Sequence, residues 1–395
     1  MKVLDYKRLA LIQEHLDASV ADKSIAGASC LVYKDGREVA YYESGMRDIE
    51  AKLPITRDTI FRMFSMSKPI TSIAVMQLIE SGRICLSDPV SKYIPSFKNQ
   101  KCFDDKGNIV PVKEEMLIKN LLDMTAGLCY PGESCEAEKI TGDFIDEVGK
   151  KLHTPEEMTT VEIATELAKL PLAFEPGEKW NYSLCADVLG AIVEIVSGMK
   201  FSDYLKKNIF EPLEMNDTDF YVPKEKQSRL CRAYNSDGVE FKEYIGENLL
   251  IQSRMEERPK FESGGAGLSS TIDDYSKICM MFLNNGEYKG KRILHPETIR
   301  FMSAGSLDEK QRSCIGNWNF LRGYTYGNLL RVLKYPGEAM SLGSYGEYGW
   351  DGWLGVYVSV IPEHNMFILY MQQRPDCGTT DVSLKLRNII FSAIK

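Results

Sequence analysis

Ser65 and Lys68 form an S-x-x-K motif directly before an apolar helical pattern over residues 67–81. Three residues span almost one helical turn, so the lysine amine folds back beside the serine hydroxyl. A hydroxyl is a weak nucleophile unless a base lies within hydrogen-bond reach. A lysine becomes that base when burial or a neighbouring charge lowers its pKa. The hydroxyl also lies at a helix N-terminus, where backbone N–H groups favour a developing oxyanion, and this context indicates a nucleophilic serine.

A second S-x-x-K, Ser197 to Lys200, shows that the motif alone does not decide the matter. It lies at the end of a predicted helix, where Gly198 breaks the turn. No helix N-terminus faces the Ser197 hydroxyl, so we expect Ser197 to be non-catalytic.

Two further clusters contain residues that are suited to catalysis or to ligand binding. Residues 175–183 form a turn that delivers Tyr182 to the start of the next helix. Tyr182 is either a second base or proton shuttle beside the lysine, or a packing tyrosine with one satisfied hydroxyl. Residues 349–355 read GWDGWLG at the entry to a late strand. Their glycines let a ligand approach the backbone, although the same pattern fits a hairpin with exposed aromatics.

The elements around these clusters predict an α+β fold. Strands are expected near both chain ends, in a hairpin around Asp35-Gly36 and in a late hairpin around residues 362–364. An amphipathic helix opens the chain and another closes it. The intervening pattern is mostly helical, with segments near residues 115–124, 159–170, 185–197 and 201–210.

We therefore expect an antiparallel sheet built from both chain ends, flanked by the terminal helices, with an inserted helical region. The predicted domains are a discontinuous sheet domain of residues 1–80 and 232–395 and a helical domain of residues 81–231. The active site is expected in the cleft between them. The segments 130–155 and 305–345 read as loops that form a lid or pocket wall.

Composition excludes several classes of function. The 395 residues carry a net charge of −8 and no basic cluster, which argues against nucleic acid or an anionic membrane surface as a partner. No stretch reaches the roughly 18 apolar residues of a membrane span, and the amphipathic start is no signal peptide, so a cytoplasmic location is expected. Ten cysteines without C-x-x-C pairs and four histidines without ligand spacing predict neither a metal site nor a cofactor. The oligomeric state stays open.

In this order and spacing, the three clusters resemble the serine β-lactamase and penicillin-binding-protein superfamily. Within it, the chain is most similar to class C β-lactamases and family VIII carboxylesterases. Residues 121–128 (LLDMTAGL) resemble the family's L-L-x-H-T-S-G-L loop, and residues 264–275 (GGAGLSSTIDDY) resemble its G-G-G-L-x-S-T-x-x-D-Y segment. The resemblance spans nearly the whole chain and implies a β-lactamase/transpeptidase-like fold.

By that resemblance, Ser65 matches the acylated nucleophile, Lys68 its partner and Tyr182 the tyrosine of the family's Y-x-N motif. Residues 349–352 fall where the family carries K-T-G or H-x-G. The implied oxyanion hole is the backbone N–H of Ser65 and that of Trp353. Which of Lys68 and Tyr182 takes the proton from the serine stays open, because their titrations are coupled.

Two departures from the family pattern bear on the substrate. Leu184 replaces the asparagine of Y-x-N, and Trp350 replaces the lysine of K-T-G, so two polar anchors for a β-lactam are absent. The expected substrate-binding residues are Leu184, Trp350, Asp351 and Gly352. Trp350 and Trp353 are expected to line a flat apolar wall that suits an uncharged group.

The leading hypothesis is a serine esterase that acts on small or medium acyl esters, so the expected partner is a small-molecule ester or amide. The alternatives are a β-lactamase or D-alanyl-D-alanine carboxypeptidase or transpeptidase, an acyltransferase of the same fold, and a non-catalytic binding protein. A Ser-His-Asp hydrolase is the least favoured, since there is no G-x-S-x-G motif.

Overall fold

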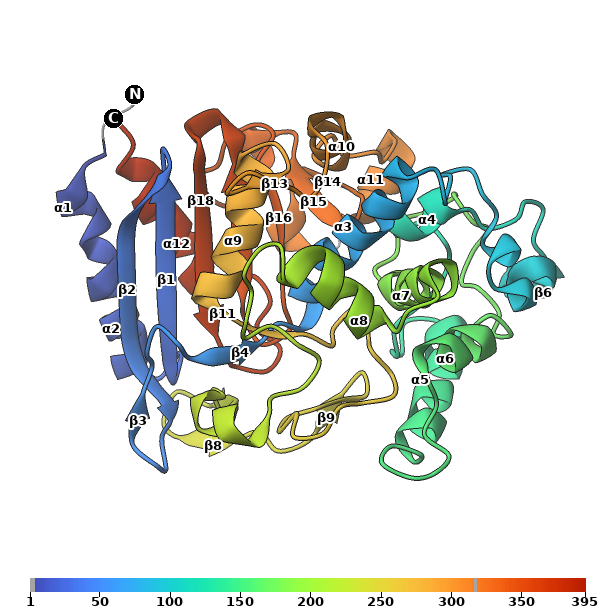
Figure 1. Ribbon diagram of the computed structural model, residues 1–395, viewed down its shortest axis with the longest axis horizontal. Coiled ribbons are helices and arrows are strands. Elements are labelled where there is room, and N and C mark those ends of the chain that lie inside the picture. The colour runs from blue at the N-terminus through green and yellow to red at the C-terminus, as the bar shows by residue number, and fades with distance from the viewer. Residues whose placement is uncertain (1–3, 316–317) are drawn as a thin grey trace.

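Residues 4–315 and 318–395, which the computed structural model describes, contain an eight-stranded antiparallel sheet (Figure 1). Its strand order is β14-β15-β16-β17-β18-β1-β2-β3, so strands from the two chain ends lie side by side. The first strand and the last pair from Ala28 opposite Gln372 to Lys34 opposite Met366. The strands are β1 (Gly27–Lys34), β2 (Arg37–Asp48), β3 (Leu53–Pro54), β14 (Tyr324–Gly327), β15 (Leu330–Leu333), β16 (Tyr348–Asp351), β17 (Tyr357–Ile361) and β18 (Met366–Gln372). The predicted fold class is confirmed.

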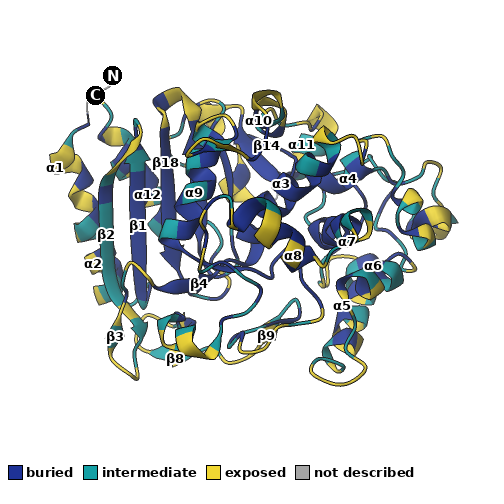
Figure 2. Cartoon of the chain, in the orientation of Figure 1, coloured by how far each residue is buried: buried dark blue, intermediate teal, exposed yellow. Residues whose placement is uncertain are grey.

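The terminal helices cover one face of this sheet. They are α1 (Tyr6–Leu9), α2 (Leu11–Ala21) and α12 (Asp381–Ser392). Leu16 of α2 and Ile390 of α12 pack with Val32 and Ile368 of the central strands in one apolar cluster. The central strands are buried along most of their length, whereas α1 and α2 are exposed on their outer side (Figure 2). The apolar stripes of both terminal helices are therefore satisfied by the sheet.

The helical region lies to the other side of the sheet in Figure 1. Its helices are α4 (Ile118–Leu122), α5 (Glu136–Gly149), α6 (Thr160–Leu167), α7 (Cys185–Ser197) and α8 (Phe201–Leu205), which a single π-helical turn (Lys206–Phe210) extends. The four predicted helical segments are confirmed. The domain boundaries at residues 80/81 and 231/232 stay a prediction.

Two segments expected to be loops contain regular structure. Residues 130–155 hold α5, whose buried stripe includes Thr141 between Ala137 and Ile145. Apolar residues at positions 137, 140, 144, 145 and 148 nevertheless recur at helical spacing, so the pattern predicts this helix and the expectation of a loop was wrong. Residues 305–345 hold α11 (Glu309–Ile315) and the hairpin of β14 and β15, whose turn residues Asn328 and Leu329 have φ of 54° and 61°. Gly327-Asn328 is a turn signal, because asparagine is common in that conformation, whereas leucine is rare there and weakens the signal.

The remaining elements connect these layers. Helix α3 (Ser67–Glu80) is followed in the chain by the helical region, and α9 (Ile272–Leu283) packs on β17 and β18. The others are β4 (Ile60–Arg62), β5 (Lys101–Phe103), β6 (Ile109–Pro111), β7 (Tyr234–Ser236), β8 (Phe241–Glu243), β9 (Glu247–Asn248), β10 (Ile251–Gln252), β11 (Ser269–Thr271), β12 (Glu287–Tyr288), β13 (Lys291–Arg292) and α10 (Pro296–Met302). Among the described residues, no helix combines the length and the apolar character that crossing a bilayer requires.

Candidate active site

The S-x-x-K serine lies in a short 3₁₀ turn, residues 64–66, that leads directly into α3. The residue before it, Phe64, has φ of 43°, a conformation that costs a non-glycine residue roughly 1–3 kcal/mol and is found where the surrounding structure holds it. Two hydrogen bonds do so: the Met63 N–H donates to the Leu268 carbonyl at 2.8 Å, and the Leu268 N–H donates to the Ser67 hydroxyl at 3.1 Å. The nucleophile candidate is therefore held by a segment 200 residues downstream.

The Lys68 amine is fully buried and surrounded by oxygen atoms. Its Nζ lies 3.1 Å from the Ser65 Oγ, 2.9 Å from the Tyr130 hydroxyl and 2.9 Å from the Gly265 carbonyl oxygen. Burial lowers the pKa of Lys68 to about 7, and the Asp187 carboxylate acts in the opposite direction. The amine is thus able to accept a proton from Ser65 near neutral pH.

Tyr182 approaches the same pair from the loop before α7. Its ring centroid lies 4.5 Å from the Lys68 Nζ, and its hydroxyl accepts a 2.8 Å hydrogen bond from the Trp350 indole N–H. Burial raises the pKa of Tyr182 well above 10, while its hydrogen bonds with Ser65 and Trp350 work the other way. The phenol therefore keeps its proton at neutral pH and is placed to donate it.

Sequence reasoning missed Tyr130, the third partner of the lysine amine. Its ring packs against that of Tyr182 with centroids 5.4 Å apart, and burial raises its pKa well above 10. Tyr130 follows the LLDMTAGL stretch by two residues. The chain has 20 tyrosines, and no local pattern distinguishes Tyr130 from the others. Its position after the LLDMTAGL stretch is the one sequence signal that could have identified it.

Asp187, on the first turn of α7, was also missed. Its carboxylate accepts hydrogen bonds from the Ser263 hydroxyl and, at 3.1 Å, from the Gly265 N–H. A Cβ on Gly265 would lie 2.7 Å from the Asp187 carboxylate, so a larger residue there would displace that carboxylate. The carboxylate therefore fixes Gly265 through its N–H, and the carbonyl of the same residue accepts from Lys68, so the 264–275 segment helps to position the amine.

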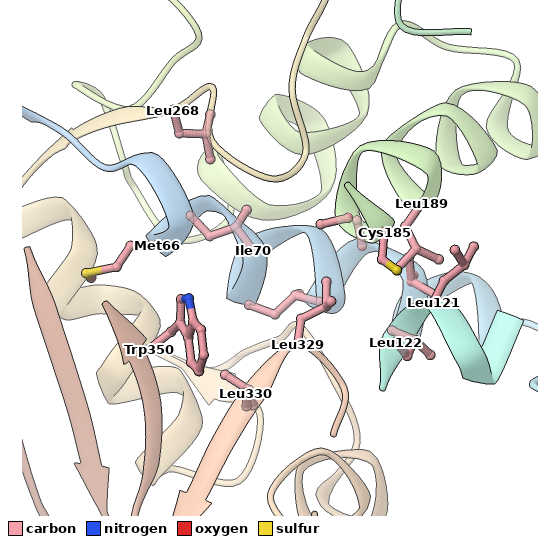
Figure 3. Close-up of a cluster of buried hydrophobic side chains, with 14 of the residues drawn as sticks. Met66, Ile70, Leu121, Leu122, Cys185, Leu189, Leu268, Leu329, Leu330 and Trp350 are labelled. Atoms are coloured by element: carbon pink, nitrogen blue, oxygen red, sulfur yellow. The ribbon is translucent and has the colours of Figure 1, made fainter. Parts of the chain in front are cut away.

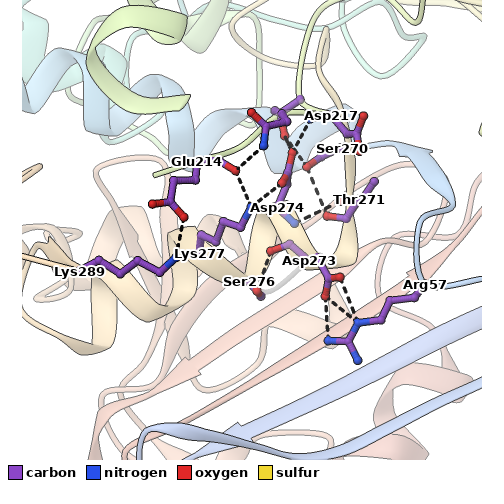
Figure 4. Close-up of polar contacts among 12 residues, drawn as sticks. Arg57, Glu214, Asp217, Ser270, Thr271, Asp273, Asp274, Ser276, Lys277 and Lys289 are labelled. Carbon is purple, nitrogen blue, oxygen red and sulfur yellow. Dashed lines mark hydrogen bonds and ion pairs between the residues drawn. The ribbon is translucent and has the colours of Figure 1, made fainter. Parts of the chain in front are cut away.

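The far end of this segment is anchored at the start of α9 (Figure 4). The Asp274 carboxylate accepts from the Asp217 N–H at 2.7 Å and from the Lys277 amine at 2.8 Å. The Thr218 hydroxyl bridges Asp274 and Ser270 of β11, at 3.1 and 2.8 Å. Both ends of the segment that positions Lys68 are thus tied to buried carboxylates.

The expected wall of Trp350 and Trp353 needs correction. Trp350 is only 1% exposed, and Figure 3 shows its side chain in the main apolar cluster, with Met66 on one side and Leu330 on the other. Trp353 instead packs against Phe64, with ring centroids 5.0 Å apart and planes tilted at 58°, in a separate small cluster. Tyr348, Gly349 and Trp350 of β16 are all buried, so Trp350 lines no open wall and instead acts on Tyr182 through its N–H.

Gly352 allows β16 to end against the loop of the nucleophile. A Cβ there would lie 2.3 Å from the Met63 carbonyl oxygen. Within the part of the chain that the structure describes, neither the Ser65 N–H nor the Trp353 N–H donates to a protein acceptor. Two unengaged N–H groups beside a nucleophile are suited to an oxyanion, and this role stays a prediction.

The other expected site residues have mainly structural partners. Leu184 is buried and precedes α7. The Asp351 carboxylate accepts from the buried Arg331 guanidinium at 3.1 Å and from the Thr379 hydroxyl. Ser197 closes α7 and bonds only to local backbone groups among the described residues, unlike Ser65.

The chain is similar to known proteins along most of its length. Residues 12–387 match the family described as "Beta-lactamase". The chain is 31% identical to Protein Rv1367c of Mycobacterium tuberculosis over 93% of this chain and 90% of that protein. It is 28% identical to Esterase EstB of Burkholderia gladioli, over 86% and 83%. Among solved structures, EstCE1, titled a hydrolase with promiscuous acyltransferase activity, superposes with a TM-score of 0.81, at 24% identity and 98% of each chain.

Proposed function

This chain belongs to the β-lactamase family and is a serine hydrolase, and we propose that it is an esterase for small or medium acyl esters. The observation that carries the proposal is the buried amine 3.1 Å from the Ser65 hydroxyl, with its pKa lowered to about 7. A lysine in that state is a competent base for a serine. The likeness to an esterase over most of both chains supports it.

The geometry supports distinct roles for the two titratable groups. The neutral Lys68 amine accepts the Ser65 proton as the serine oxygen bonds to the ester carbonyl carbon. The Ser65 and Trp353 N–H groups receive the oxyanion. The Tyr182 phenol donates its proton to the departing alkoxide as the ester C–O bond breaks, which leaves an acyl-serine and a free alcohol. Proton transfer from Lys68 to Tyr182 restores both groups, and water then releases the acid by the same steps.

The residues around the pair favour an ester over a β-lactam. Leu184 and Trp350 are buried apolar groups where related lactamases place an amide and a cation, so two polar contacts to a β-lactam are missing. An acyltransferase would use the same acyl-enzyme with an alcohol in place of water. The likeness to EstCE1 supports acyl transfer as a second candidate function. The free thiols of all ten cysteines, each within the described residues, support the expected cytoplasmic location.

The test is a side-by-side assay with p-nitrophenyl acetate, p-nitrophenyl butyrate and nitrocefin, with intact mass measured for an adduct. We expect rapid ester turnover, little nitrocefin hydrolysis and an acyl adduct on Ser65. Ser65→Ala should lose more than about 10³-fold in kcat/KM. Ser197→Ala is the matched control, since it removes the other S-x-x-K hydroxyl and should leave the rate unchanged. Normal turnover by Ser65→Ala would show that Ser65 is not the nucleophile.

A further inference from the structure

Trp318 combines a solvent-exposed ring with contact to one catalytic candidate, Tyr182. Its side chain is 41% exposed, yet its ring centroid lies 5.2 Å from that of Tyr182 and 5.9 Å from that of Trp180. The neighbouring indoles Trp180 and Trp350 are 5% and 1% exposed. Trp318 is therefore backed by aromatic rings on one side and accessible on the other.

The backbone holds this indole in place. The Trp318 N–H donates to the Ile315 carbonyl at 2.8 Å, and the Trp318 carbonyl accepts from the Leu321 N–H at 2.8 Å. Its ring meets Tyr182 at 69° and Trp180 at 87°, the edge-to-face arrangement that aromatic pairs prefer. A large apolar ring fixed by its neighbours in this way binds a flat ligand without a further ordering cost.

The location of Trp318 defines which part of a substrate it meets. Its ring contacts Tyr182, the proposed proton donor to the departing alcohol. Trp353, whose N–H is proposed to bind the oxyanion, packs instead with Phe64 and Tyr244. During acyl transfer the departing oxygen must lie beside the proton donor, while the carbonyl oxygen lies in the oxyanion hole. The open indole is consequently on the alcohol side of the ester.

We propose that Trp318 is a specificity-determining residue that stacks on a flat, aromatic alcohol portion of the substrate. The inference rests on the proposed esterase function and names the chemical class of the leaving group. Stacking against an indole favours a planar ring over a short alkyl chain by about tenfold in kcat/KM.

The test uses three esters that differ in where the ring lies: ethyl acetate, benzyl acetate and ethyl phenylacetate. Benzyl acetate carries the phenyl ring on the alcohol, and ethyl phenylacetate carries it on the acyl group. We expect Trp318→Ala to lower kcat/KM about tenfold for benzyl acetate and less than about threefold for the other two. Trp318→Phe, which keeps an aromatic ring, should retain most of the preference.

Phe320→Ala is the matched control, because Phe320 is 44% exposed on the adjacent turn and makes no ring contact among the described residues. It should leave all three rates unchanged. If Trp318→Ala lowers kcat/KM equally for all three esters, Trp318 has a structural role and the proposal is overturned. If kcat/KM falls only for ethyl phenylacetate, Trp318 contacts the acyl group instead, and the proposal is also overturned. Failure of the esterase function itself is distinguishable, since the wild-type protein would then hydrolyse no ester and show no Ser65 adduct with p-nitrophenyl acetate.

Discussion

Turnover should rise with pH as the Lys68 amine loses its proton. Burial lowers the pKa of this amine from 10.5 to about 7. This shift corresponds to a destabilisation of the charged form relative to the neutral form on the order of 5 kcal/mol. At pH 7 about half of the molecules then carry a neutral base. An amine with an unshifted pKa would be neutral in only roughly one molecule in 3000 at that pH. The buried setting of Lys68 is therefore expected to supply most of the active form.

The assay is kcat/KM for p-nitrophenyl acetate from pH 5 to 9.5, because this ester has no titrating group in that range. We expect kcat/KM to fall about tenfold per pH unit below 7 and to level off above it. Asp187→Asn removes the carboxylate that raises the pKa of Lys68, so the midpoint should move to lower pH. Asp273→Asn is the control, because that carboxylate is half-exposed and pairs with Arg57, and the midpoint of this variant should match that of the wild-type protein.

Three results would refute this reasoning. A flat profile between pH 5 and 9 would show that no group with a pKa near 7 limits acylation. A kcat/KM that still rises about tenfold per pH unit up to pH 9.5 would show that burial does not lower the pKa of Lys68. Activity that falls as pH rises through 7 would mean that the protonated amine is the working form.

Three other perturbations follow from the same contacts. Gly352→Ala would place a Cβ 2.3 Å from a carbonyl oxygen of the nucleophile loop, so kcat should fall about 10²-fold in steady-state assays, whereas Gly337→Ala, with open space around its Cβ, should be unchanged. Trp350→Phe keeps a ring but removes the N–H that donates to Tyr182, and kcat should fall about tenfold; an unchanged kcat would show that this hydrogen bond does not tune the phenol. Between pH 7 and 10 the unfolded chain keeps Lys68 protonated while the folded chain does not, so the unfolded state binds more protons and stability rises with pH. The free energy of unfolding of the wild-type protein minus that of Lys68→Met, from urea titrations, should therefore increase by up to about 1.4 kcal/mol per pH unit, and a constant difference would contradict the lowered pKa.

Local patterns in the sequence determined the nucleophile and its base, several secondary-structure elements and the family. The distance from Ser65 to Lys68 is set within one helical turn, so their proximity follows from three residues of spacing. The Asp35-Gly36 turn, with φ of 52° and 83°, and the stripe of α12 are likewise local features, and both were predicted. The order of the three clusters predicted the family, and the strand patterns at both chain ends predicted the antiparallel sheet; both predictions are confirmed.

Only the tertiary structure decided what surrounds the lysine amine. Tyr130, Asp187 and Gly265 come from three separate segments, and no local spacing relates them to Lys68. The inward orientation of Trp350 depends on its register in β16, between β15 and β17. A pKa shift arises from desolvation and from charges a few ångströms away, and those distances exist only after the chain has folded. For that reason the motif predicted a base, whereas its pKa and its partners came from the fold.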